Sequence, residues 1–100
     1  MDEREFKRRT KQFGLSIIRL VEEVPKDRIT NPLVSQLVRA ATSVGANYRA
    51  ACRGKSAADV IAKLGLVEEE ADETAYWLET LMEANIVSRK DAATFLEEAN

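Results

Sequence analysis

The sequence predicts an all-α protein, an antiparallel up-down-up-down four-helix bundle with three long helices and a shorter fourth. The first observation is a shortage of helix breakers, since 100 residues include four glycines and two prolines. A many-stranded sheet would need turn residues about every ten positions. The second is a spacing of apolar residues that alternates between three and four along the chain. With 45% hydrophobic residues, the chain can bury one core, which predicts a single domain over residues 1–100.

The first helix is expected from about residue 3 to residue 24. Its apolar stripe consists of Phe6, Thr10, Phe13, Ile17, Leu20 and Val24. Pro25 follows this stripe, and proline cannot continue a helix because it lacks the backbone N–H. After a polar turn, Asn31 and Pro32 predict the N-cap and the first helical residue of a second helix.

The second helix is expected to span about 22 residues, with Gly54 as its C-terminal stop. Its stripe consists of Val34, Leu37, Ala41, Val44, Tyr48 and Ala51. Gly45 lies inside this helix, where glycine costs up to about 1 kcal/mol relative to alanine. Such a glycine is understood if another helix passes close to it. We therefore expect close packing at Gly45 within the bundle and also between subunits.

The third helix is expected over residues 57–84, and a capping box formed by Ser56 and Asp59 precedes its apolar stripe. That stripe is the most regular in the chain and consists of Val60, Leu64, Val67, Ala71, Thr74, Leu78 and Leu81. Asn85 is suited to a left-handed C-cap. A second capping box, at residues 88–91, opens the short fourth helix, whose apolar residues are Ala92, Phe95, Leu96 and Ala99.

Composition argues against catalysis and against a metal cofactor. Histidine is absent, which removes the usual general base and a common zinc or iron ligand. Thr42, Ser43 and Cys52 have no recognisable activating base. The single cysteine excludes an internal disulfide, which favours a reduced cytoplasm. The charged N-terminus predicts no targeting segment, and no apolar run approaches the roughly 20 residues of a membrane span.

Charge is divided unevenly between the two parts of the chain. Residues 1–63 carry 13 Lys/Arg and 7 Asp/Glu, whereas residues 64–100 carry 2 and 10, so the parts have charges of +6 and −8. The split predicts either two helices that attract each other or two surfaces for different partners.

The acidic run at residues 68–73 has two interpretations. Its carboxylates could bind a metal, but bundle di-iron sites also require Glu-x-x-His motifs, which a chain without histidine cannot supply. The favoured interpretation is an ion-paired seam, in which arginines of the second helix meet two carboxylates while Glu69, Glu70 and Glu73 face solvent. The candidates for this seam are Arg39, Arg49, Arg53, Glu68 and Asp72.

Basic residues also cluster in the first helix, where they could bind nucleic-acid phosphate. The candidates are Arg4, Lys7, Arg8, Arg9 and Lys11. The alternative is a solvated helix face whose cations pair locally with Glu3 and Glu5.

Two adjacent aromatic residues, Tyr76 and Trp77, occupy the middle of the third helix. Neighbouring helical residues point about 100° apart, so both cannot face the same core. Aromatic residues with a polar group are enriched at protein interfaces. The candidate interface residues are Gly45, Tyr48, Tyr76 and Trp77.

The central segment resembles the four-helix-bundle proteins encoded in intervening sequences of bacterial 23S ribosomal RNA genes, a group related to the accessory variability protein of diversity-generating retroelements. The matching residues in the second helix are Gln36, Leu37, Arg39, Ala40, Ala41, Ser43, Val44, Ala46, Asn47, Tyr48, Ala51 and Arg53. Those in the third helix are Glu68, Asp72, Glu73, Tyr76, Trp77 and Leu78.

This resemblance implies a bundle that assembles into a ring, typically a homopentamer. The retroelement relatives are thought to engage a reverse transcriptase and nucleic acid through a basic surface, whereas this chain has a net charge of −2. Our first hypothesis is a non-enzymatic, self-assembling adaptor or scaffold, with RNA or an RNA-handling enzyme as its partner. The alternative is a purely structural homo-oligomer without nucleic-acid affinity.

Overall fold

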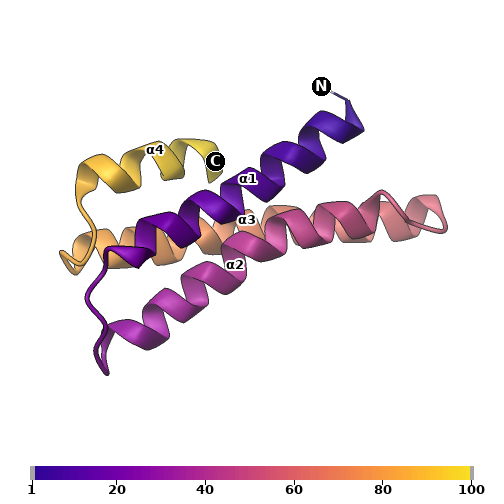
Figure 1. Ribbon diagram of the computed structural model, residues 1–100. Coiled ribbons are helices and arrows are strands. Elements are labelled where there is room, and N and C mark those ends of the chain that lie inside the picture. Colours follow the sequence, from indigo (N-terminus) through magenta and orange to yellow (C-terminus); the bar gives the residue numbers. More distant parts are fainter. Residues whose placement is uncertain (1, 100) are drawn as a thin grey trace.

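The computed structural model describes residues 2–99 and the side chains as far as Glu97, so the side chain of Ala99 lies outside the described part. Four helices make up the fold (Figure 1). They are α1 (Glu3–Glu22), α2 (Thr30–Ala51), α3 (Ala57–Glu83) and α4 (Arg89–Ala99). The predicted all-α four-helix bundle is confirmed, and no strand occurs in residues 2–99.

Successive helices run antiparallel along a molecule of 43 × 24 × 18 Å (Figure 1). The α2 helix lies between its neighbours in the chain and packs most extensively on α3, then on α1. The shorter α4 turns back along the C-terminal part of α3. None of the described helices is long and apolar enough to cross a membrane.

The core forms where the apolar stripes of the helices meet. Ile17, Leu37, Leu78 and Leu81 have no exposed surface, and they come from α1, α2 and α3. Val87 and Ala92 extend the core toward α4. Phe95 and Leu96 pack against it while remaining partly exposed. The predicted stripes therefore contain most of the buried positions, but Leu64 of the predicted α3 stripe is 40% exposed, and the buried Ala40 of α2 lies outside its stripe.

The start of α2 differs from the prediction, which placed the N-cap at Asn31. The helix begins at Thr30, and its N-cap residue, Ile29, makes no side-chain hydrogen bond. Asp27 takes over this role, because its Oδ1 accepts hydrogen bonds from the backbone N–H groups of Ile29 and Thr30 at 2.9 and 2.7 Å. One carboxylate thus satisfies two amides before the first turn.

The end of α2 also differs, because the helix stops at Ala51 and Gly54 does not adopt a left-handed conformation. Glycine is needed at position 54 because neighbouring atoms leave no room for a side chain. A Cβ at this position would lie 2.3 Å from Cγ2 of Val60 and 3.1 Å from the carbonyl oxygen of Ala51. The first helix likewise ends earlier than predicted, at Glu22.

The predicted capping residues of α3 and α4 are confirmed. Ser56 Oγ accepts a hydrogen bond from Asp59 N at 3.1 Å, and Ser88 Oγ accepts one from Asp91 N at 3.0 Å. Asn85 has a φ of 60°. Around it, Ile86 N donates to the carbonyl of Leu81 at 2.8 Å, and Asn85 N donates to that of Met82 at 3.0 Å. These two bonds form a Schellman motif that ends α3.

Candidate functional site

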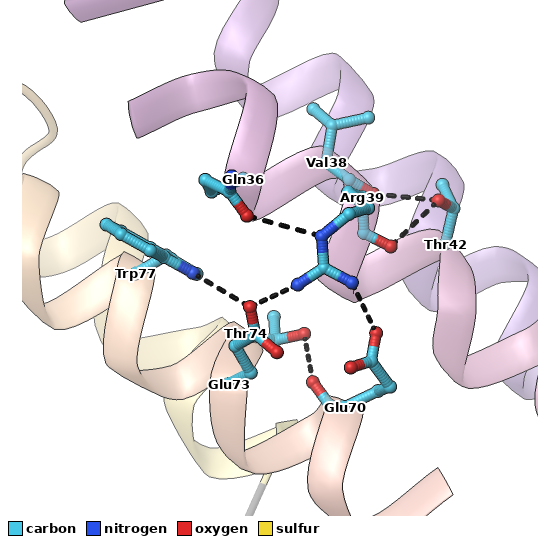
Figure 2. Close-up of polar contacts among 8 residues, drawn as sticks. All are labelled: Gln36, Val38, Arg39, Thr42, Glu70, Glu73, Thr74 and Trp77. Atoms are coloured by element: carbon cyan, nitrogen blue, oxygen red, sulfur yellow. Dashed lines mark hydrogen bonds and ion pairs between the residues drawn. The ribbon is translucent and has the colours of Figure 1, made fainter. Parts of the chain in front are cut away.

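Arg39 joins α2 to the acidic segment of α3 (Figure 2). Its Nη1 lies 2.9 Å from Glu70 Oε2, and its Nη2 donates to Glu73 Oε1. The Nε of the same guanidinium donates to Gln36 Oε1 at 3.2 Å. One planar group therefore holds two carboxylates of α3 while a residue one turn earlier in α2 orients it.

The α3 side of this cluster is also fixed by hydrogen bonds (Figure 2). Trp77 Nε1 donates to Glu73 Oε1 at 3.3 Å, so this oxygen is shared by an indole and a guanidinium. Thr74, which is fully buried, donates from Oγ1 to the carbonyl of Glu70 at 2.7 Å. Four of the residues that carry the family resemblance, Gln36, Arg39, Glu73 and Trp77, thus meet at one point.

This arrangement changes the acidity of its charged groups. The hydrogen bond from Arg39, followed by that from Trp77, lowers the pKa of the Glu73 carboxyl below its ordinary value of 4.5. The bond to Glu73 in turn raises the pKa of Arg39. Both changes favour the charged forms, which is typical of an ion pair with a structural role. The side chain of Arg39 is 47% exposed, so solvent weakens the attraction.

The acidic partners of Arg39 differ from the two that the sequence predicts. Glu68 and Asp72 are exposed, whereas Glu70 and Glu73, which were expected to face solvent, are partly buried and paired. The prediction was wrong because the seam is centred on the line of Thr74 and Leu78, which places positions 70 and 73 toward α2. Among the described residues, Arg49 and Arg53 form no ion pair.

Replacing Arg39 with alanine should lower the melting temperature at neutral pH, because two carboxylates lose their partner. The matched control is Arg53→Ala, which removes an exposed arginine without an ion pair and should leave the melting temperature unchanged. Since the pKa of Glu73 is lowered in the folded state, its stabilising contribution is complete above about pH 4.5 and disappears as pH falls through the lowered pKa. Melting curves of the parent and Glu73→Gln should therefore converge at acidic pH. Equal losses in the two arginine variants would contradict this role.

Within the described residues, no group of three Cys, Asp or Glu side chains is placed to hold a metal ion. Cys52 is partly exposed at the end of α2 and lies beside Tyr48, whose pKa is raised mainly by burial and then by Cys52. We find no activating base beside this thiol in the described structure.

A second feature is a furrow between α1 and α2. Its larger section has a volume of about 700 Å³ and is lined by four cations and by apolar or small residues. The cations are Lys7, Arg8, Lys11 and Arg49, and the other lining residues are Thr10, Gly14, Leu15, Ile18, Thr42, Gly45 and Ala46. A shallower section of about 420 Å³ continues from Ile18 toward Pro25. We call both sections together the α1–α2 furrow.

Two glycines bring the walls of this furrow together. A Cβ on Gly45 would lie 3.2 Å from the carbonyl oxygen of Thr10, and one on Gly14 would lie 3.3 Å from Cα of Thr42. The close helix contact that the sequence predicts at Gly45 is therefore present within the chain, and α1 is the partner. Tyr48 closes one end of this contact by packing edge-on against Phe6, with ring centroids 4.6 Å apart.

The predicted nucleic-acid residues lie on and beside the furrow. Arg4, Arg8, Arg9 and Lys11 are exposed, and Lys7 is partly buried. Lys7 Nζ lies 3.2 Å from Glu3, and Arg8 lies 2.5 Å from Glu5. The local pairing weighed as the alternative for this helix is thus present at two positions, and it reduces the positive potential there.

The outer side of α3 carries a stripe that the sequence analysis did not identify. With spacings of 4, 3, 4, 4 and 3, it consists of Ile61, Gly65, Glu68, Asp72, Tyr76 and Glu79. We call it the outer α3 stripe. Ile61 is 69% exposed and Tyr76 is 59% exposed, which is unusual for large apolar side chains on a long helix. Trp77 instead packs against the core. The sequence contains the outer α3 stripe as a second set of residues at helical spacing, but the more regular core stripe of the same helix obscured it.

A model of the 23S rRNA-intervening sequence protein family matches residues 3–100. A crystal structure of a protein with unknown function from the S23 ribosomal protein family of Bacteroides thetaiotaomicron is similar, with a TM-score of 0.82 and 33% sequence identity. The match covers 93% of this chain and 86% of that chain. A search among curated proteins returned no match.

Proposed function

The chain belongs to the 23S rRNA-intervening sequence protein family, and from this premise we propose that it is a non-enzymatic, self-assembling helical-bundle adaptor or scaffold. We propose further that it assembles as a homopentameric ring in the cytoplasm. The observation that carries the proposal is the exposure of large apolar residues on α3. Exposed apolar surface of this kind marks sites where proteins meet.

The distribution of apolar exposure supports an interface rather than random exposure. Among the described residues, four of the five exposed large apolar side chains, Ile61, Leu64, Leu66 and Tyr76, lie within 16 consecutive residues of α3. Tyr76 also packs edge-on against Trp77, with centroids 5.0 Å apart, so its ring is held in place by a partly buried neighbour. A pre-positioned aromatic ring loses little entropy when a partner covers it.

The test is the mass in solution, measured by light scattering after size-exclusion chromatography. The parent protein should have five times the protomer mass of 11.2 kDa. A stable mass of one protomer at micromolar concentration would contradict the proposal. An assembly with a different number of protomers would agree with a self-assembling scaffold but would contradict the pentamer.

RNA, or an enzyme that handles RNA, is the partner we propose for the adaptor. The supporting observation is the row of exposed cations on α1, at Arg4, Arg8, Arg9 and Lys11. A local basic surface of this kind can bind phosphate although the net charge of the chain is −2.

A gel-shift titration with a labelled single-stranded RNA tests this partner. Retention by the parent should occur at low salt, fall steeply as salt increases, and be lost when four α1 cations are changed to glutamate. The four are Lys7, Arg8, Arg9 and Lys11. The matched control changes four other exposed cations to glutamate, Arg28, Arg53, Arg89 and Lys90, and should keep retention. If the parent protein retains no RNA, the RNA partner is rejected in favour of the alternative, a purely structural homo-oligomer without nucleic-acid affinity.

A further inference from the structure

We infer that the self-contact of this protein is asymmetric, and that the outer α3 stripe of one copy lies in the α1–α2 furrow of the next. This inference rests on the proposed self-assembly and identifies the two surfaces that make it. It is carried by three independent observations: an unexplained glycine, complementary charges, and matching lengths of the stripe and the furrow.

The glycine is Gly65, in the interior of the 27-residue α3 helix. Glycine in a helix interior costs about 1 kcal/mol relative to alanine, so its presence requires a reason. Gly14 and Gly45 have one, since a Cβ on either would crowd the facing helix. A Cβ on Gly65 would meet no atom within 4 Å. Nothing within the described chain needs a glycine at position 65. A backbone segment of another copy that passes close to α3 would need one.

The charges of the two surfaces are opposite. The outer α3 stripe contains three carboxylates, Glu68, Asp72 and Glu79, and no cation. The larger section of the furrow is lined by four cations and no carboxylate. Two of them, Lys11 and Arg49, form no ion pair with a described residue. Lys7 and Arg8 pair only with neighbours on their own helix, and such pairs contribute little and exchange readily.

The same charges exclude a symmetric contact. Pairing α3 with α3 would bring carboxylates against carboxylates, and pairing furrow with furrow would bring cations against cations. Only contact between the two different surfaces places opposite charges together. A contact of this kind is heterologous, and its repetition forms a closed ring or an open filament rather than a dimer.

The dimensions and the apolar parts also correspond. The stripe from Ile61 to Glu79 is about 27 Å long at 1.5 Å per residue, and the α1 wall of the furrow from Lys7 to Glu22 is about 22 Å long. Leu15 and Ile18 line the furrow between its cations and its shallow end. The exposed Tyr76, at one end of the stripe, would cover them, so both apolar surfaces leave water together.

The test uses two variants, each defective in one surface. Gly65→Leu places a bulky side chain on α3 where the monomer has open space, so the fold should be kept and self-contact blocked. The double variant Lys11→Glu with Arg49→Glu reverses charge in the furrow at two exposed positions without ion pairs. Each variant alone should be helical by circular dichroism and have the mass of one protomer, 11.2 kDa. The control Ala93→Leu, at an exposed position of α4, should assemble like the parent.

Mixing the two variants should give a complex of two chains and no larger species. The intact α3 stripe of the furrow variant then meets the intact furrow of the Gly65→Leu variant, while the remaining surfaces are both defective. If the parent assembles but either variant assembles equally well, the inference is overturned and the proposed function stands. A mixture that remains monomeric also overturns it. A furrow variant that still assembles but no longer retains RNA would assign the furrow to RNA instead. A monomeric parent would reject the proposed function itself.

Discussion

Leu78→Ala should lower the free energy of unfolding by about 2–5 kcal/mol, the largest effect we expect from one substitution in this chain. Leu78 has no exposed surface and packs in the core with residues of α1 and α2. Truncation removes apolar contacts and leaves a cavity that three long helices cannot close without shifting. Since α2 packs most extensively on α3, the loss falls on the largest helix–helix contact of the protein.

Urea unfolding at fixed protein concentration measures this loss, with circular dichroism as the signal and Trp77 fluorescence as a second probe. The matched control is Leu66→Ala on the same helix. Leu66 is 43% exposed and lies outside both the core stripe and the outer stripe, so its truncation should cost no more than about 0.5 kcal/mol. Comparable losses at Leu66 and Leu78 would mean that α3 presents a different face to the bundle.

Gly45→Leu should destabilise the fold by about 1–3 kcal/mol through overpacking. Its Cβ would lie 3.2 Å from the carbonyl oxygen of Thr10 and 3.3 Å from the adjacent carbonyl carbon. Both are backbone atoms, so α1 as a whole must move away from α2, and side-chain rotation alone cannot relieve the contact. The helix propensity gained by removing glycine offsets only about 1 kcal/mol of this cost.

The control for this prediction is Gly65→Leu measured under conditions in which the protein is monomeric. The same substitution there meets open space, so it should raise the unfolding free energy by up to about 1 kcal/mol. Unfolding free energies that fall in the Gly45 variant and rise in the Gly65 variant would distinguish the effect of packing from that of helix propensity. A stable Gly45→Leu variant with unchanged oligomer size would show that α1 and α2 do not approach as closely as described.

Apolar periodicity was sufficient to predict the fold because each helix must bury its own stripe. The spacing in α3 identified Thr74, Leu78 and Leu81 as buried before any neighbour was known. Local hydrogen bonding likewise determined the caps at Ser56 and Asn85, whose partners lie within a few residues. The same reasoning failed at Asn31, because Asp27 accepts hydrogen bonds from the backbone N–H groups of Ile29 and Thr30, and the helix therefore begins before Asn31.

Which carboxylates Arg39 holds could not be decided in this way. The sequence determined that an arginine-bearing helix would meet an acidic one, since both charge clusters follow from residue order. The pairing with Glu70 and Glu73 depends on how far α3 is rotated about its axis against α2. That rotation is set by the fit of Leu37, Leu78 and their neighbours in the core, which no single helix contains. For the same reason, the sequence showed three glycines in helix interiors, and only the packed structure distinguished Gly14 and Gly45, which face a neighbouring backbone, from Gly65, which faces open space.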